Sequence, residues 1–477
     1  MFFNKCHLVK KRIPHYNVCN LNVCVVFTNV LSERTDKREK GGISLKAIRV
    51  GLLGLGTVGS GVVKIIQDHQ DKLTHQVGCP VTIQKVLVKD KDKKRDVELS
   101  KDVLTTEAYD VIQDPEVDVI IEVIGGIEET RRYLLDALQA KKHVVTANKD
   151  LIALYGSELT AAAKENGCDL YFEASVAGGI PILRSLEDGL ASDRITKMMG
   201  IVNGTTNFIL TKMNKENAPY AEVLKEAQEL GFAEADPTAD VEGLDAARKM
   251  AILARLGFSM NVDLDDVKVK GISQVSDEDI NFSKRLGYTM KLIGIAQRDG
   301  QKVEVSVQPT LLPEHHPLSS VHNEFNAVYV YGEAVGETMF YGPGAGSMPT
   351  ATAVVSDLVS VMKNMRLGVN GSSFVDPQFE KKIKAPSEIF AQQFLRIHVK
   401  DQVGSFSKIT SIFSERGVSF EKILQLPIKG HDDLAEIVIV THHTSEEDFT
   451  DILQKLNDLE VVHQVKSTYR VEGNGWS

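Results

Sequence analysis

The chain has 477 residues, of which 43% are hydrophobic and 25% are charged, and its formal net charge is −10. A chain of this length is typical of about three domains of ~100–200 residues each. The acidic balance and the scattered basic residues exclude the electrostatic footprint of a nucleic-acid-binding protein. The five cysteines lack paired short spacing, so they support neither a disulfide framework nor a zinc site, and we expect a reducing, cytoplasmic location.

The first 44 residues differ from the rest of the chain. They contain three of the five cysteines and an apolar stretch, residues 23–30. That stretch is shorter than the ~20 residues needed to cross a bilayer, so we expect no membrane association. A signal peptide is the rival interpretation, but a small-residue cleavage site is missing. Lys40-Gly41-Gly42 can be encoded by a bacterial ribosome-binding sequence, and Leu45 lies where a UUG start codon would fall. We therefore expect residues 1–44 to be a leader outside the native protein.

A glycine-rich turn follows the first predicted strand, residues 47–53. Gly54 permits the tight turn, Gly56 lets a pyrophosphate approach the backbone, and Gly59 lets the next helix, expected over residues 60–71, pack closely on the strand. The N-terminus of that helix faces the phosphates. A plain structural turn is the alternative interpretation. The pattern predicts a dinucleotide cofactor, bound by Gly54, Leu55, Gly56, Thr57, Val58 and Gly59.

Strands and helices alternate in the segment that follows. Residues 82–88, 117–124 and 143–147 read as further strands, which predicts a doubly wound, Rossmann-type parallel sheet. The charged segment 89–95 comes directly after the strand at 82–88. An acid there would hold a ribose 2′-hydroxyl and basic groups would accept a 2′-phosphate, and both are present. We favour NADP over NAD, although an exposed charged loop explains the segment equally well.

Two loops of small residues come next, residues 171–181 and 200–207. Such loops can bring backbone N–H groups to a ligand carboxylate, although simple turns would look the same. In the following segment Asp245 and Lys249 are four residues apart on a predicted helix that ends near Gly257. The apolar residues around this pair predict burial, where lysine is rare unless it is paired or functional. A structural ion pair is the alternative interpretation.

Together these segments resemble homoserine dehydrogenase of the bacterial long form. The resemblance extends from Ala47 to the C-terminus and rests on residues 54–59, 146–149, 173–181, 203–207 and 234–249. It implies an oxidoreductase that interconverts L-aspartate 4-semialdehyde and L-homoserine with NAD(P)H, in the biosynthesis of threonine, methionine and isoleucine.

The resemblance also implies roles for individual residues. Lys249 would be the proton donor, Asp245 would orient it, and Lys149 would lie across the reacting group beside the nicotinamide. The implied substrate-binding residues are Glu234 and Asp240, for the ammonium group, with Gly204 and Thr205 lining the pocket. Cofactor contacts are implied for Lys149, Gly344 and Gly346, of which the two glycines could also form only a turn. The ligands implied for a structural monovalent cation, expected to be Na⁺, are Glu173, Val176, Gly178 and Ile180.

The C-terminal segment predicts a small separate domain. Residues 395–399 and 435–441 read as strands, and residues 404–413 read as the start of a helix. The order predicted for the whole domain is βαββαβ. This order resembles an ACT domain, a regulatory amino-acid-binding module, with residues 401–405 as the ligand loop. Threonine is the effector we expect. An oligomerisation module without a ligand is the alternative, because fold alone does not establish binding.

We therefore expect an α/β protein with three folded parts. These are a nucleotide-binding domain at 47–172 to which residues 336–370 return, an α+β substrate-binding and dimerisation domain at 173–335, and, after a linker at 371–392, an ACT-like domain at 393–477. The expected assembly is a homodimer or homotetramer.

Two other functions deserve comparison. An aspartate-semialdehyde dehydrogenase needs a thiolate, but Cys168 lies in a strand-like run where a buried cysteine is expected. A non-catalytic amino-acid sensor would have no use for Lys249, Asp245 and Glu234.

Overall fold

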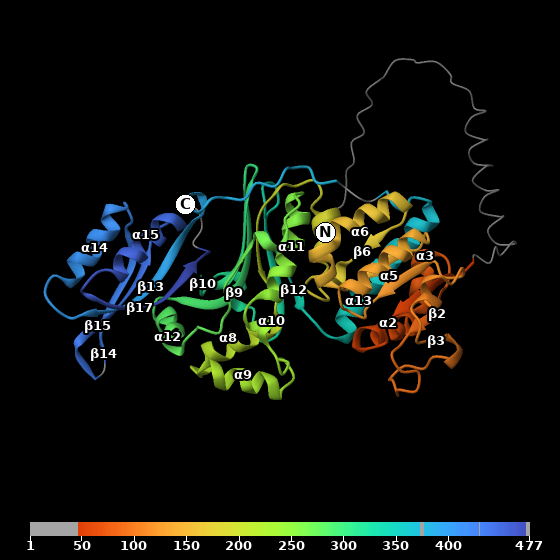
Figure 1. Cartoon of the computed structure of the whole chain (residues 1–477), viewed down its shortest axis with the longest axis horizontal. Coiled ribbons are helices and arrows are strands. Elements are labelled where there is room, and N and C mark those ends of the chain that lie inside the picture. The colour runs from red at the N-terminus through yellow and green to blue at the C-terminus, as the bar shows by residue number, and fades with distance from the viewer. Residues whose placement is uncertain (1–45, 373–375, 429, 474–477) are drawn as a thin grey trace, which may run out of the picture. The chain divides into compact units, whose positions relative to one another are not determined.

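The computed structural model describes residues 46–372, 376–428 and 430–473 (Figure 1). The leader expected at residues 1–44 lies outside the described residues. Within these ranges, no helix has both the length and the hydropathy that a bilayer crossing requires.

The N-terminal part of the described chain is a parallel sheet in the order β3-β2-β1-β4-β5-β6. Its strands are β1 (Ile48–Leu53), β2 (Val81–Leu87), β3 (Leu104–Thr105), β4 (Val119–Glu122), β5 (His143–Thr146) and β6 (Leu170–Tyr171). The central strands β1 and β4 are almost entirely buried, as a sheet covered on both faces requires. The strand order reverses between β1 and β4, and ligands of such sheets bind at this reversal, beyond the carboxyl ends of the strands. The predicted doubly wound sheet is confirmed.

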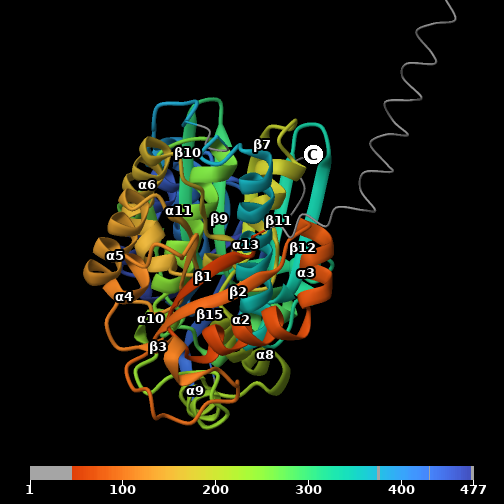
Figure 2. The ribbon, with the colours of Figure 1, turned by 90° about the vertical axis from the view of Figure 1, so that its right-hand side faces the viewer.

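Helices cover both faces of this sheet. They are α2 (Thr57–Asp68), α3 (Gln70–Val77), η1 (Lys101–Val103), α4 (Tyr109–Ile112), α5 (Glu128–Gln139), α6 (Lys149–Asn166) and, from much later in the chain, α13 (Ser347–Leu367). Figure 2 shows α13 beside α2. The contact is close, because a Cβ on Gly61 would lie 2.8 Å from the carbonyl oxygen of Ser347. The helix expected over 60–71 begins earlier, at Thr57, and ends at Asp68, because His69 leaves helical geometry with φ −114° and ψ 25°.

A second, mixed sheet runs in the order β12-β11-β7-β9-β10-β17-β13-β15-β14. Its first part is made of β7 (Ile195–Ile201), β8 (Val267–Val269), β9 (Tyr288–Asp299), β10 (Lys302–Pro313), β11 (Phe325–Gly332) and β12 (Gly336–Pro343). The helical elements of this part are η2 (Glu173–Ser175), α7 (Ile182–Arg184), η3 (Ser185–Gly189), α8 (Gly204–Glu216), α9 (Tyr220–Glu229), α10 (Thr238–Val241), α11 (Leu244–Phe258), η4 (Leu264–Asp266), α12 (Asp277–Arg285) and η5 (Pro317–Ser320). Helix α11 continues through Gly257, where the sequence predicts its end, and stops where Ser259 takes a left-handed conformation at φ 50°.

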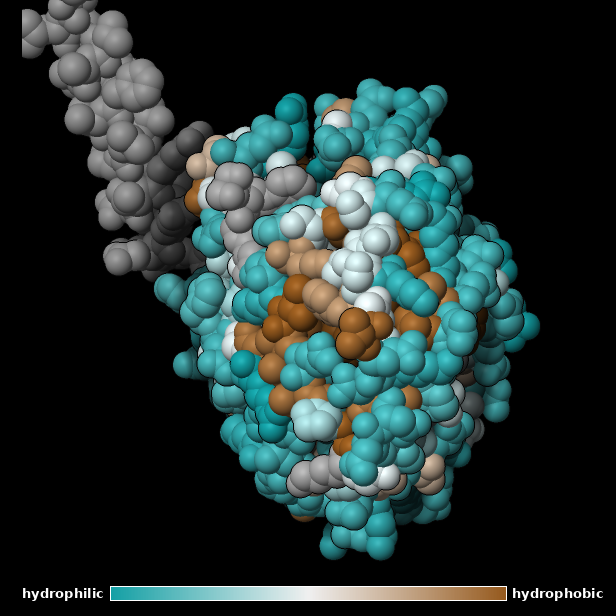
Figure 3. All heavy atoms as spheres, turned by 90° about the vertical axis from the view of Figure 1, so that its left-hand side faces the viewer, coloured by the Kyte–Doolittle hydropathy of each residue, from teal (hydrophilic) through white to brown (hydrophobic). Residues whose placement is uncertain are grey.

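The C-terminal part has the predicted βαββαβ order. Its elements are η6 (Pro386–Glu388), β13 (Phe390–Lys400), α14 (Ser405–Glu415), β14 (Phe420–Ile428), β15 (His431–Thr441), the short β16 (Thr444–Ser445), α15 (Glu446–Asn457) and β17 (Val462–Val471). Strand β17 is antiparallel to β13 and parallel to β10, so the second sheet continues into this domain. Figure 3 shows hydrophobic residues near the centre of the face that it presents. Exposed apolar side chains of this domain include Val403, Phe406 and Ile423.

Candidate active site

The glycine-rich turn between β1 and α2 leaves room for a ligand. Gly54 has φ +107°, which favours glycine, and a Cβ on Gly59 would collide with the carbonyl oxygen of Gly54. Gly56 is exposed at the N-terminus of α2, and a Cβ there would meet no atom within 4 Å. The space over Gly56 and the free N-terminal N–H groups of α2 fit the pyrophosphate of a dinucleotide.

Glu122 organises the neighbouring turn. It ends β4 fully buried, and its carboxylate accepts N–H groups of Ile124 (2.8 Å) and Gly125 (3.0 Å) and the hydroxyl of Thr146 (2.5 Å). Burial raises the pKa of Glu122, although these hydrogen bonds act in the opposite direction. The turn lies against the glycine-rich turn, since a Cβ on Gly54 would be 2.8 Å from Ile124. Sequence reasoning missed Glu122, and the only signal was an acid near the end of an apolar strand.

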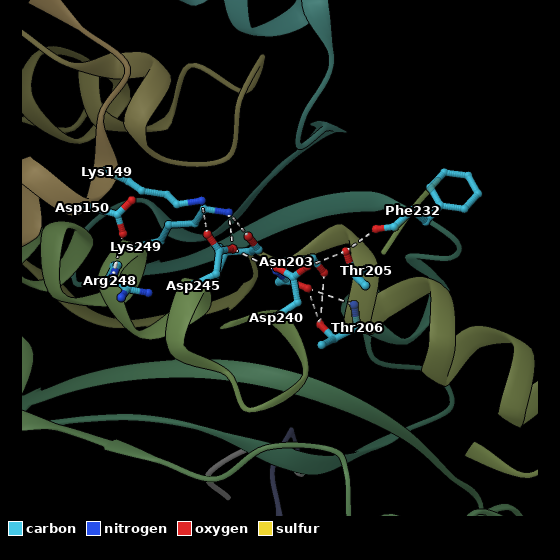
Figure 4. A network of polar contacts seen from close by, with 11 residues as sticks. Lys149, Asp150, Asn203, Thr205, Thr206, Phe232, Asp240, Asp245, Arg248 and Lys249 are labelled. Carbon is cyan, nitrogen blue, oxygen red and sulfur yellow. Dashed lines mark hydrogen bonds and ion pairs between the residues drawn. The ribbon is translucent and has the colours of Figure 1, made fainter. Parts of the chain in front are cut away.

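The ammonium groups of two lysines meet at one buried carboxylate (Figure 4). Lys249 Nζ lies 2.7 Å from Asp245 Oδ2 and donates to the carbonyl oxygen of Val202 at 2.7 Å. Lys149 Nζ lies 2.5 Å from Asp245 Oδ1. Asp245 and Lys249 are on α11, whereas Lys149 begins α6 in the nucleotide-binding domain, where the Asn148 side chain caps that helix. The structure thus brings the three predicted catalytic residues together.

This cluster favours the charged forms of Asp245 and Lys149. Burial alone would raise the pKa of Asp245, but the ammonium groups of Lys249 and Lys149 hold it well below its usual range. Burial likewise opposes the charge of Lys149, and the attraction of Asp245 outweighs it, so the pKa of Lys149 is raised. The Lys249 side chain is 11% exposed and that of Lys149 is 37% exposed. One carboxylate therefore holds two ammonium groups, one enclosed and one partly open to solvent.

Asn203 connects this cluster to a second acid. Its side-chain oxygen caps α8 by accepting the N–H of Thr206, and its amide nitrogen donates to Asp245 Oδ2 (2.9 Å) and Asp240 Oδ1 (2.7 Å). Thr205 Oγ1 lies 3.1 Å from Asp240 Oδ2 and donates to the carbonyl oxygen of Phe232 at 2.6 Å (Figure 4). Two of the predicted substrate-binding residues, Asp240 and Thr205, are thus part of the network. Asn203 was missed as a site residue although it lies in one of the small-residue loops.

Glu234 and Gly204 are the other two predicted substrate-binding residues. Glu234 is exposed on the loop between α9 and α10, and its carboxylate makes no hydrogen bond or ion pair within the described ranges. Gly204 begins α8, where a Cβ would lie 2.8 Å from the carbonyl oxygen of Glu324. Gly204 is therefore required by close packing, and Glu234 keeps a free charged group at the surface.

The two later glycine-rich loops pack against each other. A Cβ on Gly178, which has φ +55°, would collide with the carbonyl oxygen of Gly344, and Gly179 N donates to the carbonyl oxygen of Pro343 at 3.2 Å. Gly344 itself lies too close to Asn326 to carry a side chain. Gly346 has φ +119° at the N-terminus of α13. Packing and backbone conformation thus account for these glycines, whether or not they also contact a cofactor.

The carboxylate of Glu173 accepts two backbone hydrogen bonds. It is buried and accepts the N–H groups of Leu183 and Arg184, each at 2.8 Å. Burial raises the pKa of Glu173, which these hydrogen bonds and the charge of Arg184 oppose. Each carboxylate oxygen keeps a further lone pair, so both the carboxylate and the backbone carbonyl of Glu173 have the chemistry of a cation ligand.

Backbone carbonyls of the same loop have the chemistry that a hard cation prefers. The carbonyl oxygens of Val176 and Gly178 accept no hydrogen bond in the described part of the chain. Those of Glu173 and Ile180 accept the N–H groups of Val176 (3.3 Å) and Ile182 (2.8 Å). The four predicted ligands thus lie on one tight loop, where carbonyl oxygens could serve a monovalent cation.

Cys168 is not placed for nucleophilic chemistry. It is a free cysteine, 1% exposed, and burial raises the pKa of its thiol. The thiolate form is therefore disfavoured, contrary to what an acyl-transferring aspartate-semialdehyde dehydrogenase needs.

Comparison with known proteins gives a consistent result along the chain. Residues 54–173 match the family model described as "Homoserine dehydrogenase, NAD binding domain", residues 181–359 match "Homoserine dehydrogenase", and residues 394–461 match "ACT domain". The chain is 86% identical over 433 residues to the homoserine dehydrogenase of Bacillus subtilis, covering 91% of this chain and 100% of the relative. It is 43% identical to that of Corynebacterium glutamicum, covering 89% and 96%.

Solved structures agree. A homoserine dehydrogenase from Thiobacillus denitrificans matches with a TM-score of 0.83 at 38% identity, covering 90% of this chain and 99% of that one. The Staphylococcus aureus enzyme at pH 8.5 matches with a TM-score of 0.72 at 40% identity, covering 90% and 100%. A hyperthermophilic archaeal homoserine dehydrogenase in complex with NADPH matches with a TM-score of 0.57 at 25% identity, covering 70% and 100%.

Proposed function

The chain belongs to the homoserine dehydrogenase family, and we propose the following roles for its residues in the interconversion of L-aspartate 4-semialdehyde and L-homoserine. A nicotinamide cofactor, held at the turn 54–59, supplies a hydride to the carbonyl carbon when it is bound. Negative charge then develops on the aldehyde oxygen. The protein must therefore provide a proton or a cation at that oxygen.

Lys249 donates this proton, and Lys149 stabilises the developing alkoxide from the other domain. The observation that carries the proposal is the shared carboxylate, because Asp245 contacts the ammonium groups of both lysines. Asp245 is a positioning residue, since it contacts both ammonium groups and fixes their separation. Asn203 holds Asp245 in turn, through the hydrogen bond at 2.9 Å.

Glu234 and Asp240 bind the substrate ammonium group. Support comes from the unpaired carboxylate of Glu234 and from the connection of Asp240 to Asp245 through Asn203. A carboxylate that forms a charge-assisted hydrogen bond with an ammonium group suits this role. Thr205 orients Asp240, and Gly204 allows α8 to begin close by.

Steady-state assays with L-homoserine and each nicotinamide cofactor test this function. We expect cofactor reduction that depends on homoserine and needs no phosphate. Phosphate-dependent oxidation of the semialdehyde would instead identify an aspartate-semialdehyde dehydrogenase, and binding without turnover would identify a sensor.

We further propose that NADP is preferred to NAD. The support is segment 89–95, which follows β2 and carries four lysines and one arginine, all but Arg95 exposed. Basic groups at this position suit a 2′-phosphate. The ratio of kcat/KM for the two cofactors tests the preference, and a ratio that favours NAD would contradict it.

The loop from Glu173 to Ile180 binds a monovalent cation, which we propose to be Na⁺. The free carbonyl oxygens of Val176 and Gly178 support this proposal. The melting temperature should be higher in NaCl than in choline chloride of equal ionic strength. Equal melting temperatures in the two salts would contradict the proposed Na⁺ site.

Threonine binds the ACT domain, and this binding lowers the dehydrogenase activity. An effector can act only if it favours one conformation, and typical couplings are ~1–3 kcal/mol. Deleting the domain would also remove β17 from its place beside β10, so a point variant is the sharper test. Asp401→Ala, in the loop 401–405, should weaken inhibition by L-threonine. Unchanged inhibition in this variant would place the effector elsewhere.

The proposed assembly is a homodimer or homotetramer in the cytoplasm, serving threonine, methionine and isoleucine biosynthesis. Exposed apolar residues such as Tyr341 of β12, 55% exposed, and Ile423 of the edge strand β14, 44% exposed, support self-association. Light scattering of the purified protein measures the assembly, and a monomer would contradict it.

A further inference from the structure

A buried carboxylate at the end of β4 connects the turn beside the dinucleotide site to the start of α6. Strand β4 lies between β1, which leads to the glycine-rich turn, and β5, which leads to Lys149. Glu122 is the last residue of β4 and is fully buried, and its register partner is Thr146, the last residue of β5. Ligands of such sheets bind beyond these carboxyl ends. Glu122 is therefore placed to act on both sides of the candidate active site.

On one side, the carboxylate fixes the turn that follows β4. Glu122 Oε1 accepts the N–H groups of Ile124 at 2.8 Å and Gly125 at 3.0 Å. Gly125 has φ +71° and Gly126 has φ +77°, so the turn has neither helical nor extended conformation. Hydrogen bonds to a charged acceptor are the strong ones, and two of them hold this turn in one conformation.

On the other side, the carboxylate reaches the segment that carries Lys149. Glu122 Oε2 accepts the hydroxyl of Thr146 at 2.5 Å, and Thr146 Oγ1 accepts the N–H of Asn148 at 3.0 Å. Asn148 Nδ2 then donates to the carbonyl oxygen of Gly126 at 2.7 Å, which closes a ring of hydrogen bonds. Lys149 follows Asn148 and begins α6, so the ring fixes the point from which its side chain extends.

The ring needs a group with two acceptor oxygens. The single proton of the Thr146 hydroxyl goes to Glu122, because Thr146 Oγ1 already accepts from Asn148. An amide in place of the carboxylate would turn its NH₂ group either to the N–H groups of Ile124 and Gly125 or to Thr146. In the first orientation donors face donors, and in the second the Thr146 proton loses its acceptor. Glutamine therefore keeps the size of the side chain but breaks the ring in both orientations.

A second buried acid of the same sheet shows what a purely structural carboxylate does. Asp169 directly precedes β6 and is fully buried. It accepts from Asn364 at 3.0 Å, from the Asn370 side chain at 2.7 Å and from Gly371 N at 2.7 Å. These partners lie at the C-terminal end of α13 and just after it, whereas the glycine-rich loop at Gly344 precedes this helix. Asp169 thus fastens the end of a helix to the sheet, away from the lysine cluster.

We propose that Glu122 is a positioning residue of the reaction, which holds the turn 124–126 and, through Thr146 and Asn148, the start of Lys149 on its way to Asp245. Glu122 acts through these neighbours and not on the reacting atoms. Its role in turnover rests on the proposed function of Lys149. Loss of the ring should lower kcat, because the ammonium group must meet the developing alkoxide at a fixed separation.

Steady-state kinetics of point variants test this role. Glu122→Gln and Thr146→Val should each lower kcat at least about tenfold, with a smaller change in KM for homoserine. The double variant should be no worse than the more impaired single variant, since both changes break one ring. Thr146→Ser keeps the hydroxyl and should recover most of the loss. Asp169→Asn is the matched control, and it should lower the free energy of unfolding while kcat is kept.

A second measurement does not depend on turnover. Burial opposes the charge of Lys149, and its ion pair with Asp245 holds the pKa of Lys149 above the usual value. A ¹³C NMR titration of the reductively methylated protein measures this pKa, and the signal is identified by its loss in Lys149→Arg. In Glu122→Gln and Thr146→Val the pKa of Lys149 should fall, because the contact with Asp245 weakens.

Four results would overturn this role of Glu122. These are wild-type kcat in both Glu122→Gln and Thr146→Val, losses that multiply in the double variant, an equal loss of kcat in Asp169→Asn, and an unchanged pKa of Lys149 in both ring variants. Circular dichroism shows whether Glu122→Gln is folded, and Thr146→Val decides the question if it is not. A wild type that does not oxidise homoserine contradicts the proposed function, and the NMR titration then decides the role of Glu122 by itself.

Discussion

Two buried ion networks lie at the two junctions of the substrate-binding domain, and they differ in how far they are enclosed. At the junction with the nucleotide-binding domain, Lys149 and Lys249 share Asp245, and the Lys149 side chain is 37% exposed. At the junction with the ACT domain, Glu472 lies between Lys197 and Arg470, each within 2.6 Å, and none of these side chains is more than 12% exposed.

The difference concerns what each network can do. Lys197 and Arg470 lower the pKa of Glu472 to about 2 although burial acts in the opposite direction, just as the two lysines do for Asp245. In the enclosed network the charges balance one another, since Glu304 also pairs with Arg470. In the other network one carboxylate faces two ammonium groups, and one of these is open to solvent. The open network suits chemistry on a developing anion, and the enclosed network suits the joining of domains.

Within the open network, the removal of Lys249 should have the largest effect on turnover. In Lys249→Ala we expect kcat to fall about 10³-fold, because general acid catalysis contributes ~10²–10⁴-fold. Cofactor affinity should stay near the wild-type value, since the lost group acts on the transition state. Steady-state assays measure kcat, and fluorescence titration measures cofactor affinity. A large fall in kcat with unchanged cofactor affinity supports the role. Near-normal kcat in the folded variant would exclude it.

Removing the central charge of the enclosed network should affect stability and leave the chemistry alone. Glu472→Gln leaves Lys197 and Arg470 without their shared carboxylate, and breaking a buried pair in this way costs about 3–5 kcal/mol. Urea unfolding measures the loss. The control is Glu460→Gln, because the Glu460 side chain is 87% exposed and its pair with Lys400 should contribute under ~1 kcal/mol. Equal stability of the two variants would contradict the comparison.

Glu234 tests whether the open network extends to substrate binding. Glu234→Gln should raise KM for homoserine about tenfold with little change in kcat, because a hydrogen bond between charged groups is worth ~1.5–3 kcal/mol. Glu229→Gln is the matched control, since Glu229 is an exposed acid at the end of the neighbouring helix α9. A change confined to kcat would give Glu234 a different role.

A third buried lysine, Lys291, extends the comparison, because it forms no ion pair with a carboxylate of the described residues. Lys291 Nζ donates to Asn207 Oδ1 at 2.9 Å and to the carbonyl oxygen of Val321 at 2.5 Å. Burial, with a smaller contribution from the positive charge of Lys215, lowers the pKa of Lys291 to about 7. The unfolded chain then binds one more proton than the folded chain between about pH 7 and the ordinary lysine pKa of ~10.4.

The free energy of unfolding should therefore rise with pH in that window, and the stabilisation should be lost as pH falls towards 7. Lys291→Met removes this titration. Between pH 7.5 and 8.5 the wild type should gain up to ~1.4 kcal/mol relative to the variant, the limit for one proton per pH unit. Urea unfolding at several pH values measures the slope. Parallel curves for the two proteins would show that Lys291 keeps its proton in the fold.

Local features of this protein could be predicted from the sequence. The turn at Gly54 and Gly59, the four-residue spacing of Asp245 and Lys249, and the βαββαβ order all depend on backbone conformation and periodicity within short segments. Such segments carry their own physical signal, because a tight turn needs glycine and a buried helix face needs apolar neighbours. Even there the helix boundaries differ by a few residues, as at Thr57.

Only the tertiary structure determined which distant groups meet. Lys149 reaches Asp245 from another domain, Asn203 joins Asp245 to Asp240, and the two glycine-rich loops meet at Gly178 and Gly344. The resemblance implied a shared site for several of these residues, but not these contacts. Nothing in the sequence indicates that Glu304 Oε2 is buried without a hydrogen-bond partner among the described residues, because this depends on the side chains that surround it. Contacts, burial and the pKa values that follow from them arise from packing between segments far apart in the chain, which no local pattern contains.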